Sequence, residues 1–126
     1  MDRTNHADIR IGTLAGLGQG ADYLRQILPH GFESFELTAW AHLGDINLTE
    51  TAKSCLDVCG DQAIISSVGI YGNPLQDDET VRGWEALIKG AKEFGCNVVC
   101  GFAGAQEDRP VDQNMARFKE ATVAGG

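Results

Sequence analysis

The chain has 126 residues, with 18 acidic and 10 basic side chains, and its formal net charge is −8. This sign repels nucleic-acid phosphates and anionic lipids, which argues against both as partners. No apolar run approaches the roughly 20 residues that span a bilayer, and residues 1–8 lack the apolar stretch of a signal peptide. We therefore expect a cytoplasmic protein, with residues 1–126 forming one domain.

The sequence predicts one strand followed by one helix, repeated four times. The first strand is predicted at 9–14 (I-R-I-G-T-L), a glycine-rich turn at 15–20, and a helix at 21–28 that stops at Pro29. Alternating apolar residues predict a second strand at 32–39.

The second and third helices begin with side chains typical of helix N-termini. Asn47 is followed three residues later by Glu50, which resembles a cap with a nearby acid. The third strand is predicted at 62–70, and its continuous A-I-I suits burial on both faces. The acids of 77–79 favour the positive end of a helix, so we interpret them as a helix start rather than a metal site.

The fourth unit completes the pattern. A strand is predicted at 97–102, and after Pro110 a last helix places four side chains in one stripe. These are Val111, Met115, Phe118 and Thr122. Strand–helix alternation predicts an α/β fold with parallel strands and right-handed crossovers. A TIM (β/α)8 barrel has eight such units, so four units indicate either a small open sheet or half of a barrel.

A nucleotide site is not favoured by the first turn. Its glycines follow G-x-G-x-G, not the dinucleotide-binding G-x-G-x-x-G, and no P-loop is present. Glu36 lies in the middle of the second strand, so it does not occupy the ribose-binding position at the strand end. Glu33 and Glu36 point to opposite faces of a strand and cannot act together.

The cysteines form two C-x-x-x-C pairs, at 55 and 59 and at 96 and 100. Zinc sites more usually have C-x-x-C spacing. We therefore expect free, partly buried thiols.

Aromatic, imidazole and amide side chains follow the predicted strands. Trp40 and His42 follow the second strand, Tyr71 and Asn73 the third, and Phe102 the fourth. Flat rings pack on the C–H faces of a sugar and amides bond its hydroxyls, so these residues are the candidate substrate-binding set. Other roles remain open for three of them: solvated loop residue for His42, turn former for Asn73 and core filler for Trp40.

Four segments carry a family resemblance. They are I-R-I-G-T-L, F-E-L, S-S-V-G-I-Y-G-N-P-L and N-V-V-C-G-F-A-G. Together they resemble the sugar phosphate isomerase/epimerase family, whose members are xylose-isomerase-like TIM barrels. The resemblance spans nearly the whole chain and corresponds to the N-terminal half of such a barrel. It implies substrate-pocket walls for aldose–ketose isomerisation or ketose epimerisation through an enediol.

The resemblance also implies that the metal site belongs to the C-terminal half of the barrel. In the family a divalent metal, Mn or Mg, is held by Glu, Asp, His and Glu at the ends of strands 5 to 8. We therefore assign no catalytic residue and no metal ligand here, expect no tight metal binding, and expect the chain alone to be inactive. It would be a natural fragment or a truncated chain of the enzyme.

Four strands of a barrel leave exposed edges and an uncovered inner face. We therefore expect self-association, as a homodimer that rebuilds a barrel-like sheet or as a higher oligomer. The expected ligand is a small, polar, sugar-like molecule. The alternative function is a non-catalytic α/β module for oligomerisation or small-ligand binding.

Overall fold

Four parallel strands form one sheet in which the spatial order is the chain order, β1-β2-β3-β4. The computed structural model describes the backbone of residues 9–125 and the side chains up to residue 120. Residues 1–8, on which the signal-peptide prediction depends, and the Thr122 side chain lie outside this description. The strands are β1 (Gly12–Gly16), β2 (Ser34–Ala39), β3 (Ile64–Ile70) and β4 (Val99–Gly101).

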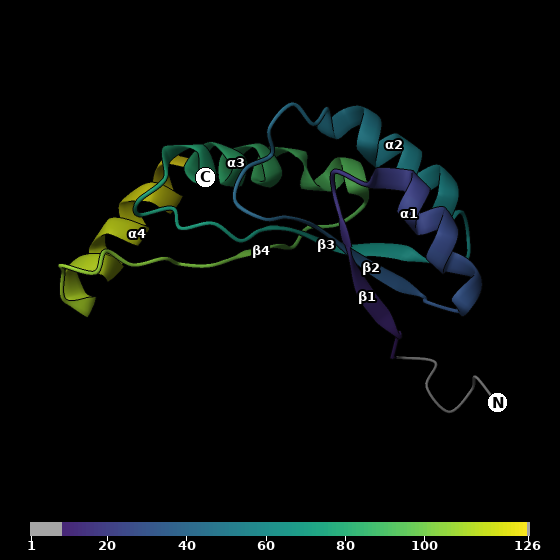
Figure 1. Cartoon of the computed structure of the whole chain (residues 1–126), viewed down its shortest axis with the longest axis horizontal. Coiled ribbons are helices and arrows are strands. Elements are labelled where there is room, and N and C mark those ends of the chain that lie inside the picture. Colours follow the sequence, from purple (N-terminus) through teal and green to yellow (C-terminus); the bar gives the residue numbers. More distant parts are fainter. Residues whose placement is uncertain (1–8, 126) are drawn as a thin grey trace.

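The helices alternate with the strands, which confirms the predicted α/β class. The helical elements are α1 (Gly20–Ile27), η2 (Leu28–His30), α2 (Leu48–Cys59), α3 (Asp78–Gly90), η3 (Ala91–Phe94) and α4 (Val111–Gly125). Figure 1 shows α1, α2 and α3 on one side of the sheet, while no described helix covers the other side. We call that second side the uncovered face.

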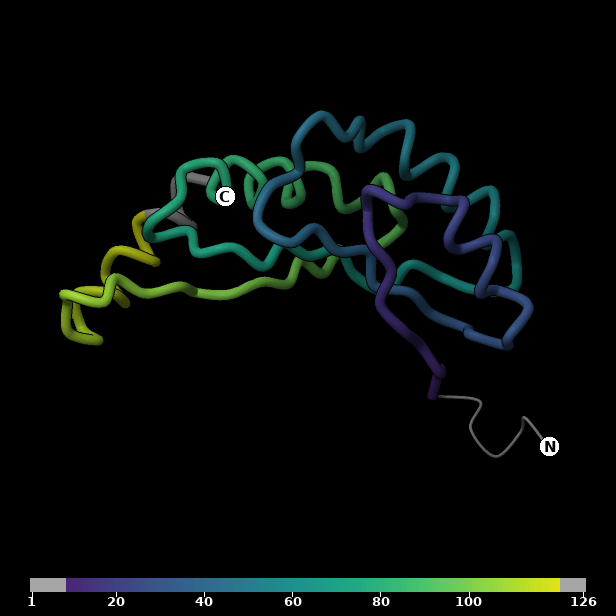
Figure 2. Tube along the Cα trace, viewed as in Figure 1, coloured from purple at the N-terminus to yellow at the C-terminus, as the bar shows by residue number. Residues whose placement is uncertain are grey.

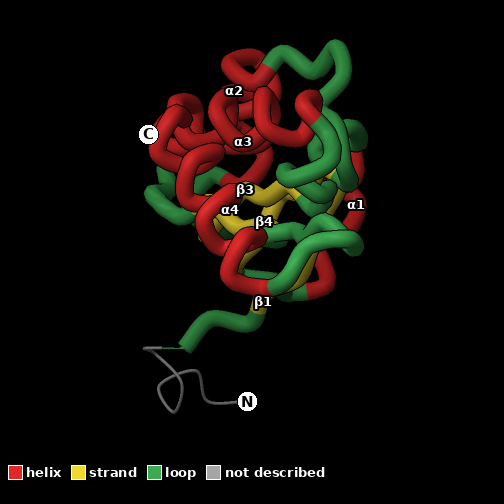
Figure 3. Tube along the Cα trace, turned by 90° about the vertical axis from the view of Figure 1, so that its left-hand side faces the viewer, coloured by secondary structure: helices red, strands yellow, loops and turns green. Residues whose placement is uncertain are grey.

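The same layering is visible from the end of the molecule. In Figure 3, α2 and α3 lie above the strands. Figure 2 shows the chain after β4 running away from the sheet before it turns into α4, and α4 contacts α3. A parallel sheet with strands in chain order has all its crossovers in one direction, so same-handed connections place the helices on one face.

The core lies between the sheet and the helices. Its largest fully buried side chains come from both layers and include Leu24, Phe35, Leu37, Val68, Ile70, Leu87 and Phe94. Trp84 of α3 packs against this cluster. An added Cβ at Gly101 of β4 would overlap the Trp84 indole, so the glycine allows the helix to approach the strand.

Helix ends follow the sequence signals. The Asn47 side chain accepts a hydrogen bond from the Glu50 N–H at 3.1 Å, and Asp77 accepts one from the Glu79 N–H at 3.0 Å. Gly31 and Gly95 adopt φ of 94° and 78° after their helical segments, the left-handed conformation that ends a helix at low cost. The predicted caps are confirmed, and 77–79 is a helix start.

The first strand was predicted at the wrong position. It begins at Gly12 and continues through Ala15 and Gly16, which the sequence assigned to a turn. The reason is strand pairing: Ala15 pairs with Leu37 and Gly16 with Thr38. Ladder hydrogen bonds and the burial of Ala15 outweigh the preference of glycine for turns.

Candidate functional site

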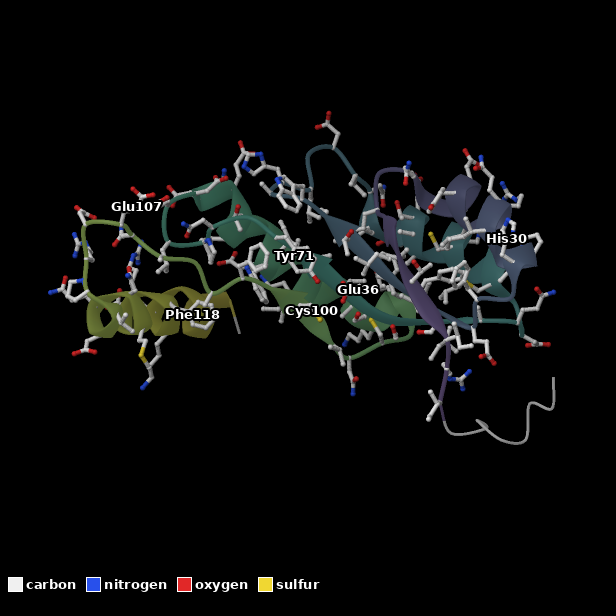
Figure 4. All side chains as sticks on the ribbon, turned by 60° about the horizontal axis from the view of Figure 1, so that its bottom comes forward. His30, Glu36, Tyr71, Cys100, Glu107 and Phe118 are labelled. Carbon is white, nitrogen blue, oxygen red and sulfur yellow. The ribbon has the colours of Figure 1, made fainter. Side chains whose placement is uncertain are left out.

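The partly buried carboxylate of Glu36 lies on the uncovered face, on the inner strand β2. Glu36 of β2 accepts hydrogen bonds from the Ser67 hydroxyl at 2.6 Å and from the Tyr71 hydroxyl at 2.7 Å, one on each carboxylate oxygen. The Cys100 thiol of β4 also bonds this carboxylate. Figure 4 shows Glu36, Tyr71 and Cys100 together on the sheet. We call these four residues the Glu36 cluster.

Local geometry brings the cluster together. The β2–β3 register shifts between Phe35 and Glu36, and beyond the shift Glu36 pairs with Ser67. Phe35 and Leu37 on either side are buried against the helices. Side chains alternate along a strand, so Glu36 points to the uncovered face.

The cluster keeps its carboxylate charged. Burial raises the pKa of Glu36, but the hydrogen bonds from Ser67, Tyr71 and Cys100 outweigh it, and the net pKa lies below the usual value. Burial, with the bond to Glu36, raises the pKa of Tyr71 to about 12. The phenol therefore stays protonated and donates to an ionised carboxylate near neutral pH.

Aromatic rings extend the cluster toward the carboxyl ends of the strands. The rings of Tyr71 and Phe102 meet edge to face, with centroids 5.1 Å apart and planes at 66°. Phe102 is 53% exposed, and Trp40, just after β2, is 79% exposed. We call Trp40, Tyr71 and Phe102 the rim. Trp40 is not core filler, because its side chain is largely in solvent.

His42 lies apart from the cluster. Its Nε2 contacts the Asp77 carboxylate, and its Nδ1 lies 3.3 Å from a Glu79 carboxylate oxygen. The hydrogen bond from His42 is the main reason that the pKa of Asp77 lies below its usual value. His42 thus connects the loop after β2 to the start of α3, and it is not simply a solvated loop residue.

Asn73 forms a turn. Its Oδ1 accepts from the Leu75 N–H at 3.0 Å, and its Nδ2 donates to the Ala105 carbonyl at 2.8 Å and to Gln76 at 3.2 Å. These bonds use the polar groups of the amide. The structure therefore places Asn73 in the turn-forming role that the sequence left open.

A hollow lies beside Glu36 on the uncovered face. It has a volume of about 410 Å³, and its lining is mostly hydroxyl-bearing and small. The lining residues are Gly12, Thr13, Leu14, Ser34, Glu36, Ser66 and Ser67. A second hollow of about 470 Å³ lies between the loop after β2 and α3, where Glu79 and Arg82 line it. Only the first one joins the Glu36 cluster.

The four cysteines all lie within the described residues 9–125 and form no disulfide. All four cysteines are free, as predicted, and burial raises the pKa of Cys55 to about 11. No group of three or more His, Cys, Asp or Glu side chains in this range could hold a metal ion. No helix in the same range is long and apolar enough to cross a membrane.

No protein-family model, curated protein or solved structure matches this chain. Trp40, Tyr71 and Phe102 directly follow β2, β3 and β4, the strand-end positions that the sequence predicted for them. The sequence prediction passed over Glu36, because it considered only roles at strand ends or paired with Glu33. The alternation in F-E-S-F-E-L-T-A was the signal that could have identified it, because it places Glu36 on the opposite face of the strand from Phe35 and Leu37.

Proposed function

We propose that this chain is a sugar-binding half-barrel, equivalent to the N-terminal half of a sugar phosphate isomerase or epimerase. The observation that carries the proposal is the edge-to-face pair of Tyr71 and Phe102, directly bonded through Tyr71 to the Glu36 carboxylate. Exposed rings supply a surface for sugar C–H groups, and the adjacent polar groups supply hydrogen bonds for hydroxyls. In this role the chain forms pocket walls.

The sheet supports the half-barrel part of the proposal. Open doubly wound sheets carry helices on both faces, and parallel sheets are rarely bare on one side. This sheet has chain-order strands with α1, α2 and α3 on one face (Figure 1), which is the arrangement of successive units in a barrel. A closed barrel of this type takes eight strands, and the described chain supplies four.

In the complete enzyme the chemistry would be proton transfer between adjacent carbons of a hydroxy-carbonyl sugar. A divalent Mn or Mg ion would polarise the substrate oxygens, and the other four strands would have to supply its ligands. The residues described here orient the sugar. Tyr71 and Phe102 would pack on it, while Glu36 and Ser67 would bond its hydroxyls.

Sugar binding can be tested by titrating the chain with ketoses and aldoses while following backbone amide chemical shifts. We expect shifts at Tyr71 and Phe102. Phe102→Ala should weaken binding roughly fivefold, because an aromatic contact contributes about 1 kcal/mol. Met115→Ala is the matched control, since Met115 is an exposed apolar side chain of α4 (66%). Absence of shifts at the rim with every sugar, in a folded protein, would contradict the proposal.

A second copy of this chain is the partner that we propose for the two free edges of the sheet. β1 pairs only with β2, and β4 only with β3, so each described edge strand has a free side. A two-fold axis along the barrel would set β4 beside the β1 of the other copy with strands parallel. Leu14 of β1, 59% exposed, would then be buried.

Sedimentation velocity at micromolar concentration should therefore show a dimer. Leu14→Lys should shift it toward monomer by placing a charge in the interface, whereas Leu56→Lys on α2 should not. Leu56 is 37% exposed and lies on the helix layer. A folded wild-type monomer at this concentration would exclude the dimer but leave the sugar-binding test unaffected.

A further inference from the structure

The hollow beside Glu36 contains a charge that the described residues do not balance. The Glu36 carboxylate accepts hydrogen bonds from neutral groups: Ser67, Tyr71 and Cys100. None of the ion pairs formed among the described residues includes it. A partly buried carboxylate is favoured by a positive partner, so this hollow selects for cationic ligands.

We propose that the hollow binds the ammonium group of an amino sugar or a similar aminopolyol, with the Glu36 carboxylate as counter-ion. This inference rests on the proposed sugar-binding function and specifies the class of sugar. Ser34 and Ser66 line the same hollow, and their hydroxyls would bond the ligand's hydroxyls.

The bonding pattern of Glu36 distinguishes between kinds of cation. A guanidinium binds best as a fork to both oxygens of a carboxylate. Here each oxygen already accepts a hydroxyl, Oε1 from Ser67 and Oε2 from Tyr71, so a fork would compete with both. A compact ammonium needs one remaining acceptor position and has donors for neighbouring hydroxyls.

Metal ions and anions fit the hollow less well. Hard cations such as Mg²⁺ and Ca²⁺ take several oxygen ligands, commonly from more than one carboxylate. Glu36 is the only carboxylate among the residues that line this hollow. An anionic group at the same position would be repelled. The volume of about 410 Å³ falls within the range of small-molecule sites.

The test compares three ligands that share one sugar ring and differ at carbon 2: 2-amino-2-deoxyglucose, its N-acetyl derivative and glucose. Calorimetric titration of the full chain at low salt gives the affinities, and amide chemical shifts at Ser67 and Tyr71 give the location. We expect the amine to bind roughly tenfold more tightly than glucose, the size of one charge-assisted hydrogen bond. Added salt should reduce this preference.

Two variants distinguish the effect of the Glu36 charge on binding from an effect on folding. Glu36→Gln keeps carbonyl acceptance from Ser67 or Tyr71 but removes the charge, and it should abolish the preference for the amine. Glu107→Gln is the control: it makes the same change in an exposed loop that Figure 4 shows far from the cluster. Circular dichroism and thermal unfolding would check that both variants are folded.

The outcomes distinguish the two proposals. Equal binding of amine and glucose at the rim would overturn the amino-sugar inference and leave the sugar-binding function in place. A preference for the amine that survives in Glu36→Gln would also overturn it, because the charge would lie elsewhere. If none of the three ligands binds and none shifts a rim amide resonance, both proposals are overturned.

Discussion

Phe35→Ala is expected to lower the free energy of unfolding by about 3–5 kcal/mol. Phe35 lies on β2 in the middle of the sheet, and none of its side chain is exposed. Its ring also lies 6.3 Å from that of Phe32 at a tilt of 57°. Alanine would remove the buried apolar area of the phenyl ring and leave a cavity between the sheet and the helices. Domains have only about 5–15 kcal/mol of net stability, so the loss is a large part of the total.

Urea unfolding followed by circular dichroism gives this value, and Phe102→Ala is the matched control. It deletes the same side chain at a position that is 53% exposed, so its expected cost is below about 1 kcal/mol. Phe102→Ala should weaken sugar binding without much loss of stability, and Phe35→Ala should show the stability loss. Equal destabilisation by the two variants would mean that the core does not lie where the structure places it.

Gly101→Ala is expected to destabilise the chain by about 1–3 kcal/mol. A Cβ at Gly101 would overlap both the Ile70 carbonyl oxygen of β3 and the Trp84 indole of α3. The carbonyl belongs to the neighbouring strand, so the strain cannot be relieved by rotating a side chain. Either β4 or α3 must move, and because Phe102 is the next residue, the rim would move with it. Thermal unfolding and sugar titration should therefore both report the change.

Gly18→Ala makes the same chemical change at a permissive position. An added Cβ at Gly18 meets nothing within 4 Å, and Gly18 is not among the positive-φ glycines. This variant should be neutral or stabilise by up to about 1 kcal/mol, because alanine restricts the unfolded chain. A Gly101→Ala protein as stable as Gly18→Ala would contradict the close packing of β4 against α3.

Several elements of the fold were predictable because their signals are local. The Asn47 cap and the acids of 77–79 act within one helical turn. The glycines at 31 and 95 end helical segments by their own conformational freedom. Apolar alternation in 32–39 identified β2. These features depend on residues a few positions apart, so the sequence alone determined four strand–helix units and their class.

The site depended on contacts between distant positions, and only the tertiary structure decided it. Glu36 and Tyr71 are 35 positions apart, as are His42 and Asp77. One pair belongs to the cluster on the uncovered face, and the other connects the loop after β2 to the start of α3. The limits of β1 were likewise decided by pairing with β2. A register shift beside Phe35 determines which β3 side chain faces Glu36. Strand pairing is set by the summed burial and hydrogen bonding of the whole sheet, and no local pattern contains that sum.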